Sequence, residues 1–168
     1  MEASALLALA LACAPQVHPD TARALVIAES AFNPWAIGVV GGTLVRQPRH
    51  RDEALTTARA LQAGGWNFSV GLAQINVGNF ERLGLTVESA FEPCANLAAM
   101  QAVLAECFKQ AGSPTSPRQS QFALRQALSC YYSGNFVTGF RHGYVRRVVS
   151  GARTAARPIP AVQGKENT

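Results

Sequence analysis

The sequence has little negative charge and few charged residues of either sign. Only 10 of its 168 residues are Asp or Glu, and charged residues make up 15% of the chain, against 48% hydrophobic residues. This apolar content can offset the entropy lost on ordering, which excludes a disordered acidic or basic protein and suits one folded domain. The 15 Lys and Arg residues leave a net charge of +5, which suggests a polyanionic neighbour such as nucleic acid, a membrane surface or an anionic polymer. The shortage of carboxylates also leaves few candidates for acid chemistry.

Cysteine is scarce as well, and its spacing argues against a metal site. Cys13, Cys94, Cys107 and Cys130 are scattered and form neither a C-x-x-C pair nor a Cys/His cluster, so we expect no zinc site. Of the three possible disulfide partners for Cys94, Cys107 is the least favourable, because a helix over that stretch would hold the two roughly 20 Å apart. Disulfides and four buried free thiols remain equal alternatives.

Long hydrophobic runs are absent too. The longest, Ala5–Ala12, is too short to span a bilayer, so we expect no transmembrane anchor. It makes a poor signal peptide, because Glu2 precedes it and no Lys or Arg does. We therefore expect residues 1–12 to form an N-terminal apolar helix or the remnant of a signal, which leaves the export route open. One domain over 13–152 and a flexible tail over 153–168 would follow.

Hydrophobic spacing and turn residues predict a mainly α (α+β) chain with a small β-hairpin. Apolar residues at helical spacing predict a helix that ends near Ser30, before the helix-breaking pair Asn33-Pro34. Two β-prone runs, 37–40 and 43–45, flank Gly41-Gly42 and predict the hairpin. A further helix is expected to begin at a cap residue, Asp52, and to end at Gly64-Gly65. Three more are expected over 95–108, 119–132 and 140–149.

Glu29 is the one acidic residue in an unusual position. It follows Leu25 and Val26 by three or four residues, so it shares their helical face, which should pack inward. It also lies near the helix C-terminus, where the macrodipole disfavours negative charge. Burial and dipole both raise the pKa of a carboxyl group, which keeps it protonated near neutral pH and able to donate a proton. The alternative is a Glu at a helix end that bends out to water.

Five short motifs, in order along the chain, resemble those of the lysozyme-like lytic transglycosylases. The ordered set extends over residues 13–149 and so covers most of the chain. The segment 38–70 together with the Cys-Tyr-Tyr-Ser-Gly-Asn run is similar to the VirB-type transglycosylase subunit of type IV secretion systems. The matching segments are Ala28–Ala36 for "ES.fnp.A", Gly71–Asn76 for "GLMQIN", Asn96-Leu97 for "P..Ni", Ala127–Asn135 for "A..aYNaG" and Tyr144–Val148 for "Yv.kV".

This resemblance implies a goose-lysozyme-like α fold whose cleft holds a peptidoglycan strand. Such enzymes cut the β-1,4 bond between N-acetylmuramic acid and N-acetylglucosamine and leave 1,6-anhydromuramyl ends. One Glu acts first as acid and then as base, and by motif position it is Glu29. The resemblance also implies a periplasmic location in a Gram-negative bacterium, with type IV secretion components as partners and neither a metal nor another cofactor.

The first and second motifs imply four substrate contacts around the acid. Ser30 would orient the substrate N-acetyl group or Glu29, and Gly71 would permit a close backbone approach beside the cleft. Gln74 and Asn76 would offer amide groups to the sugars. The structural alternative for both amides is that they only satisfy a turn.

The last two motifs imply three more contacts and contain one departure from the family. Tyr131 would hydrogen-bond Glu29 or the reacting sugar, and Tyr144 would give support from the last helix. The alternative for both tyrosines is packing in the core. The family has Asn where this chain has Tyr132, so the role of that Asn is either absent or taken over by Asn135.

Two other functions compete with the transglycosylase. A lysozyme-type hydrolase would need a second carboxylate, for which Asp52 or Glu53 could serve if their segment folds over the site. A non-catalytic assembly or nucleic-acid-binding module would exploit the net charge of +5. The arginines are scattered and not interleaved with aromatic residues, so we expect no nucleic-acid partner.

Overall fold

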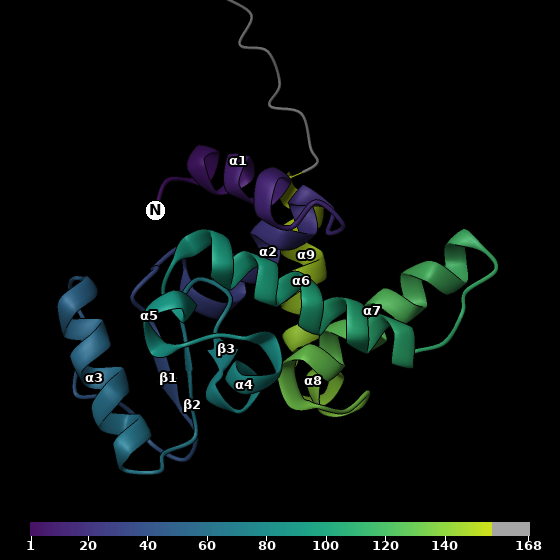
Figure 1. Ribbon diagram of the computed structural model, residues 1–168. Coiled ribbons are helices and arrows are strands. Elements are labelled where there is room, and N and C mark those ends of the chain that lie inside the picture. Colours follow the sequence, from purple (N-terminus) through teal and green to yellow (C-terminus); the bar gives the residue numbers. More distant parts are fainter. Residues whose placement is uncertain (156–168) are drawn as a thin grey trace, which may run out of the picture.

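The structure is a computed structural model that describes residues 1–155, and in that range it is mainly helical with one small sheet (Figure 1). Helix α6 crosses the middle of the molecule, with the sheet and α3 on one side of it and α7 and α8 on the other. The predicted α+β class is confirmed. The helices are α1 (Ala3–Cys13), α2 (Pro19–Ser30), α3 (Arg51–Ala63), η1 (Val77–Asn79), α4 (Phe80–Leu83), α5 (Val87–Ala90), α6 (Pro93–Gln110), α7 (Pro117–Ser133), α8 (Thr138–Arg141) and α9 (Tyr144–Ala155).

Helix α2 has the ends and the buried face that its sequence predicts. Pro19 occupies its first turn, and the His18 side chain caps it by accepting a hydrogen bond from the backbone N–H of Asp20 at 3.3 Å. Its last residue is followed by Ala31 in the left-handed conformation, with φ of +49°. Leu25 and Val26 are fully buried, and the helix packs against α9.

The β structure differs from the predicted hairpin. Strand β1 (Ile37–Val39) pairs antiparallel with β2 (Phe68–Val70), and β2 pairs with β3 (Ile75–Asn76). The predicted partner run 43–45 forms no strand, because the edge of β1 is occupied by a side chain. The Gln47 amide accepts a hydrogen bond from the N–H of Ile37 and donates one to its carbonyl, both at 2.8 Å. A single amide thus replaces the expected second strand.

Two helix boundaries also differ from those predicted. The cap of α3 is His50 and not Asp52, because the His50 ring accepts the backbone N–H of Glu53 at 3.4 Å. The expected helix over 140–149 is divided into α8 and α9 by Gly143, whose φ of +71° breaks the helical path. Helix α9 continues through the first three residues of the expected tail, and the rest of that tail lies outside the described residues.

Two disulfides fasten the helices around α6. Cys13 is bonded to Cys94, which ties α1 to α6, and Cys107 is bonded to Cys130, which ties α6 to α7. The alternative of four free thiols is therefore wrong, and the pairing judged least favourable from the sequence is not used. By closing loops of 81 and 23 residues, the two bonds restrict the unfolded chain more than the folded one.

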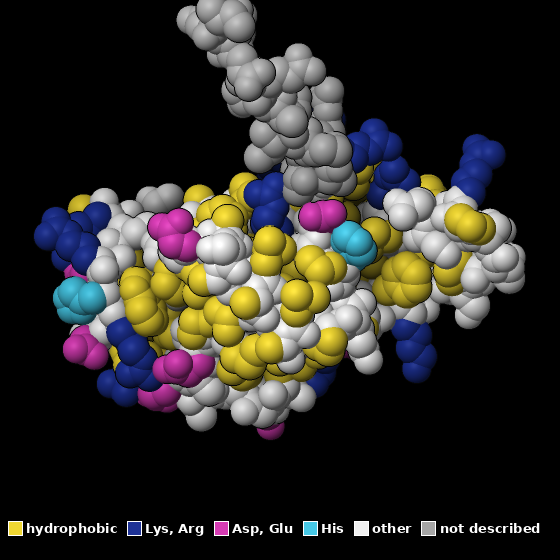
Figure 2. Space-filling model, turned by 90° about the horizontal axis from the view of Figure 1, so that it is seen from above, with side chains coloured by type: hydrophobic (Ala, Val, Ile, Leu, Met, Phe, Trp, Pro, Cys, Tyr) yellow, Lys and Arg dark blue, Asp and Glu magenta, His cyan; other side chains and the backbone are white. Residues whose placement is uncertain are grey.

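The outer surface of α1 is apolar, and hydrophobic side chains gather on the face of the molecule that carries this helix (Figure 2). Within α1 only Leu6 and Ala10 are buried, whereas Leu11 is 62% exposed. None of the helices in residues 1–155 combines the length and the hydropathy needed to cross a membrane.

Asn96, in the first turn of α6, holds the turn between β2 and β3. Its side-chain oxygen accepts the N–H of Ala73 at 2.8 Å, and its amide nitrogen donates to the carbonyls of Val70 and Ala90 at 3.0 and 2.7 Å. Gly71 has a φ of +80°, and a Cβ at this residue would lie 2.4 Å from the Asn96 nitrogen. The close approach expected at Gly71 is therefore made to Asn96.

Replacing Gly71 with Ala should destabilise the fold more than the strain of a left-handed backbone conformation alone would. Gly84 is a matched control, because it has a φ of +64° but a Cβ added there would meet no atom within 4 Å beyond its chain neighbours. Gly84→Ala should cost about 1 kcal/mol for the left-handed backbone, and Gly71→Ala about 2 kcal/mol more for the collision with Asn96. Urea unfolding of the two variants measures this difference, and equal losses would contradict the collision.

Candidate active site

A cleft of about 770 Å³ lies between the sheet, the C-terminal half of α6 and the end of α7. Glu29 of α2 and Arg82 of α4 also line it, so the chain brings several separate regions of the sequence to one cavity. Of the eight residues predicted for the site, four line this cavity and four lie outside its lining. Those in the lining are Glu29, Gln74, Asn76 and Tyr131, and those outside it are Ser30, Gly71, Asn135 and Tyr144.

Glu29 is the next-to-last residue of α2 and points its partly buried carboxyl group at the cleft. Burial raises the pKa of Glu29 from 4.5 to about 7, because desolvation penalises the charged carboxylate. Two weaker effects oppose this rise: a hydrogen bond from Tyr144 and the positive charge of Arg147. The carboxyl group can therefore hold a proton near neutral pH and remain stable after losing it, as an acid that later acts as a base requires.

Tyr144, the first residue of α9, is the direct partner of Glu29. Its hydroxyl donates to the Glu29 Oε1 atom at 2.5 Å. Burial first, and then the charge of Glu29, raise the pKa of Tyr144 far above its ordinary value, so the hydroxyl remains a donor. The Tyr144 ring stacks on Tyr132 with a centroid distance of 4.6 Å, and the Arg147 guanidinium lies 5.8 Å from the Tyr144 ring centre. These contacts fix the donor against the acid.

Tyr131 makes a different contact from the one expected at the acid. Its hydroxyl donates to the carbonyl of Ala73 at 2.7 Å, so the hydrogen bond to Glu29 comes from Tyr144 instead. Burial, followed by the charge of Glu29, raises the pKa of Tyr131 and keeps that hydroxyl protonated. Tyr131 thus joins α7 to the turn between β2 and β3 while its ring lines the cleft.

Gln74 in the turn and Asn76 in β3 line the cleft, and their side chains also hold the local backbone in place. Gln74, in the left-handed conformation with φ of +50°, donates from its side chain to the carbonyls of Ala36 and Gly71, both at 3.0 Å. Asn76 donates to the Asn67 side chain at 2.7 Å and accepts the N–H of Gly78 at 2.9 Å. Both side chains therefore satisfy local backbone groups, as the structural alternative expected, and in addition they line the cleft.

Ser30 and Asn135 have local partners away from the cleft lining. The Ser30 hydroxyl donates to the carbonyl of Val26 at 3.2 Å, within its own helix. The Asn135 side-chain oxygen accepts the N–H groups of Val137 and Thr138 at 3.0 and 2.8 Å, just before and at the start of α8. Neither residue contacts Glu29 through these bonds.

The cleft also contains an ion pair that the motifs did not indicate. Arg82 of α4 and Glu106 of α6 both line it, and their Nη1 and Oε2 atoms are 2.6 Å apart. Glu106 is the only lining carboxylate besides Glu29 in residues 1–155, whereas Asp52 and Glu53 lie on α3 outside the lining. No local pattern could reveal this pair, because 24 residues separate its members. The described part of the chain contains no cluster of metal-ligating side chains.

The comparisons with known proteins identify the family of this chain. The family model described as "Transglycosylase SLT domain" matches residues 7–147. The type IV secretion system protein virB1 of Brucella suis biovar 1 is 50% identical over 161 residues, which cover 93% of this chain and 67% of that protein. Protein virB1 of Agrobacterium fabrum is 38% identical over 151 residues, which cover 89% of this chain and 60% of that protein. No solved structure was found to match.

The family predicted from the five motifs is therefore confirmed. Its match extends from α1 into α9 and includes every element that lines the cleft. The chain belongs to the transglycosylase SLT domain family, in which it is a lytic transglycosylase related to the VirB1 proteins.

Proposed function

We propose that this lytic transglycosylase cleaves the β-1,4 bond between N-acetylmuramic acid and N-acetylglucosamine in peptidoglycan, with Glu29 as its single acid and base. The observation that carries the proposal is a carboxyl group in the cleft wall whose pKa is raised by burial to about 7. A general acid works best when its pKa lies near the working pH.

The reaction needs one proton donor that later accepts a proton. Protonated Glu29 gives its proton to the glycosidic oxygen as the bond to the anomeric carbon breaks, and the N-acetylglucosamine unit leaves with that proton. The muramyl 6-hydroxyl then bonds to the same carbon and gives its proton to the Glu29 carboxylate. The product is a 1,6-anhydro end, no water is consumed, and Glu29 is protonated again. The Tyr144 hydroxyl stabilises the carboxylate between the two steps.

The arrangement of carboxylates favours this route over hydrolysis. Hydrolysing glycosidases normally use two carboxyl groups on either side of the scissile bond. The second carboxylate in this cleft, Glu106, is already paired with Arg82, and the candidates Asp52 and Glu53 lie on α3 outside the cleft lining. A substrate hydroxyl as nucleophile removes the need for a second protein carboxylate.

The setting that we propose is the periplasm of a Gram-negative bacterium, where the enzyme would open the wall locally for a type IV secretion system. The name of the Brucella relative places that protein in such a system, at 50% identity to this chain. The two disulfides support an oxidising compartment, because such bonds are rare in a reducing cytosol. Peptidoglycan strands and secretion components would be the partners.

Glu29→Gln should abolish the release of soluble fragments from purified sacculi, because the amide can neither donate nor accept the required proton. We expect a loss of about 10²–10⁴-fold, the usual contribution of a general acid and base. Mass spectrometry of the digests gives rate and product together. Wild-type digests should contain 1,6-anhydro ends, and reducing ends would indicate hydrolysis. Asp52→Asn removes a carboxylate outside the cleft lining and serves as the control.

The pH dependence of kcat/KM should follow the protonation of Glu29. Only the protonated carboxyl group can begin the reaction, and its pKa is raised from 4.5 to about 7. The rate should therefore be high on the acid side of pH 7 and decline as the pH rises through about 7. Initial rates on soluble glycan strands between pH 3.5 and 9 measure this limb. A midpoint near the ordinary Glu value would contradict the effect of burial.

Tyr144→Phe should shift the same limb to higher pH. The Tyr144 hydroxyl stabilises the charged form of Glu29, so its loss raises the pKa of Glu29 further. The Phe ring can keep the stack on Tyr132, which separates the lost hydrogen bond from lost packing. The maximum kcat should fall as well, because the carboxylate formed during proton transfer loses its donor. An unchanged or lower midpoint would show that this hydrogen bond does not act on Glu29.

A further inference from the structure

The wall of the cleft formed by α4 and α6 carries its only ion pair among the described lining residues. Arg82 donates from Nη1 to Glu106 at 2.6 Å and from Nη2 to the Asn79 side-chain oxygen at 2.9 Å. These contacts hold the guanidinium plane against the wall and occupy two of its five N–H donors. Gln110, one turn beyond Glu106 on α6, adds a side-chain amide to the same cavity lining.

The Arg82–Glu106 pair is open to solvent and therefore to a ligand. The Arg82 side chain is 47% exposed and the Glu106 side chain 48% exposed. An ion pair so exposed adds little to stability, typically about 0–1 kcal/mol. Stabilising the contact between α4 and α6 therefore does not by itself explain why the pair lies in the cleft. Apart from Glu29, all other side chains that line the cleft are neutral.

The chemistry of the pair selects a particular kind of ligand. Its two charges cancel, so it attracts neither a lone carboxylate nor a lone ammonium group strongly, because each would meet a like charge beside the opposite one. A group that carries an ammonium and a carboxylate on one carbon can place each against its counterpart. The sugar units of peptidoglycan are uncharged, and its charged groups lie on the stem peptides.

We propose that the Arg82–Glu106 pair is a subsite for the stem peptide, and that it binds the free amino-carboxylate end of a diamino dicarboxylic acid in that stem. The ligand carboxylate would accept from the remaining N–H donors of Arg82, and its ammonium would donate to Glu106. The amides of Asn79 and Gln110 would meet the peptide backbone. This inference rests on the proposed function, since it assumes that peptidoglycan occupies the cleft.

The test measures binding to the Glu29→Gln protein, so that no strand is cut during the titration. Three tetrasaccharide ligands share the same sugars: one without peptides, one with a dipeptide stem that ends before the diamino acid, and one with a tripeptide stem that ends in it. Calorimetry gives Kd for each ligand. The tripeptide ligand should bind roughly tenfold more tightly than the other two, the effect of about two charge-assisted hydrogen bonds at an exposed site.

In the background Glu29→Gln, the double substitution Arg82→Gln with Glu106→Gln should bring the preference for the tripeptide ligand down to about one. The readout is the ratio of two Kd values, so any effect on the sugars themselves cancels. The pair Arg59–Glu88 is a matched control, with the same 2.6 Å separation, side chains 58% and 43% exposed, and a position outside the cleft lining. Arg59→Gln with Glu88→Gln should keep the full preference.

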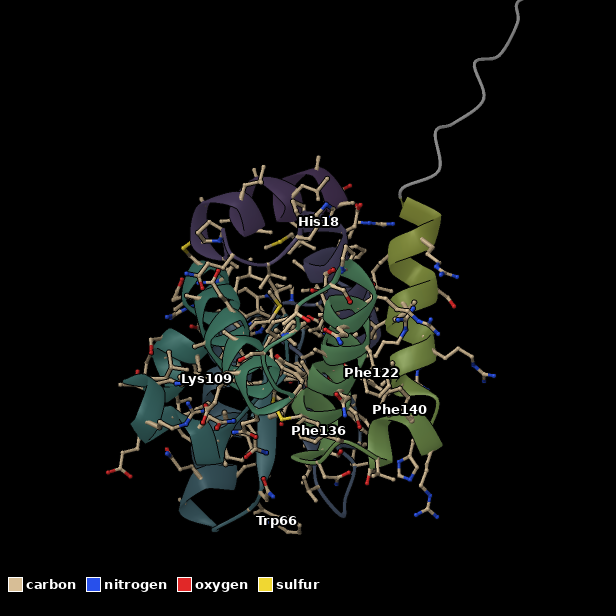
Figure 3. The ribbon with its side chains drawn as sticks, turned by 90° about the vertical axis from the view of Figure 1, so that its right-hand side faces the viewer. His18, Trp66, Lys109, Phe122, Phe136 and Phe140 are labelled. Atoms are coloured by element: carbon tan, nitrogen blue, oxygen red, sulfur yellow. A yellow bond between two sulfur atoms is a disulfide. The ribbon has the colours of Figure 1, made fainter. Side chains whose placement is uncertain are left out.

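A second control addresses the general field of the protein. Lys109 lies near the end of α6, close in sequence to Glu106 (Figure 3), but is not part of the cleft lining. Lys109→Gln removes a neighbouring positive charge and should keep the preference, if contact and not long-range attraction is responsible. Thermal melting of every variant checks that the fold is retained.

Three results would overturn the subsite. Equal Kd values for the dipeptide and tripeptide ligands would exclude recognition of the zwitterion. A preference that survives the double substitution would place the stem elsewhere. A preference lost equally in the Arg59–Glu88 control would show that the effect is not specific to the pair in the cleft. None of these results bears on Glu29, whose role is decided separately by turnover of sacculi.

Discussion

The removal of one carboxyl group from water is the constraint on which the site depends. Glu29 sits at the end of α2, where a side chain would ordinarily turn out to solvent, and the fold closes α9 over it. The hydroxyl that meets it comes from Tyr144, 115 residues away in the sequence. Burial raises the pKa of Glu29, while Tyr144 and Arg147 limit the rise. Both the protonated and the charged form of the carboxyl group are therefore accessible near neutral pH. The role proposed for Glu29, to give and take the same proton, needs this balance.

Side-chain amides take the place of backbone partners at several points of the small sheet. Gln47 satisfies the edge of β1, and Asn96 satisfies both sides of the turn after β2. These amides therefore satisfy backbone groups that no strand pairs. That turn positions Gln74 and Asn76 in the cleft lining and accepts the hydroxyl of Tyr131 at Ala73. The part of the lining that this turn supplies is therefore polar and neutral, as the proposed binding of sugar hydroxyl and acetamide groups requires.

Local patterns predicted those features that depend on neighbours in the sequence. The face shared by Leu25, Val26 and Glu29 follows from helical spacing, and the end of that helix follows from Asn33-Pro34. The predicted hairpin failed because β1 pairs with β2, and its other edge is met by a single side chain, Gln47, which has no strand-like pattern. The hydroxyl that donates to Glu29 belongs to Tyr144, whereas Tyr131 donates to the carbonyl of Ala73. Motif order does not reveal which acceptor each hydroxyl meets in the fold.

The sequence by itself determined the helical class, the candidate acid at Glu29 and, through the order of its motifs, the family. Only the tertiary structure decided which cysteines pair, which tyrosine donates to the acid, and that Arg82 and Glu106 meet in the cleft. The physical reason is range. Helical periodicity and turn chemistry act over a few residues, whereas desolvation, disulfide geometry and charge pairing depend on distances that exist only once distant segments have packed together.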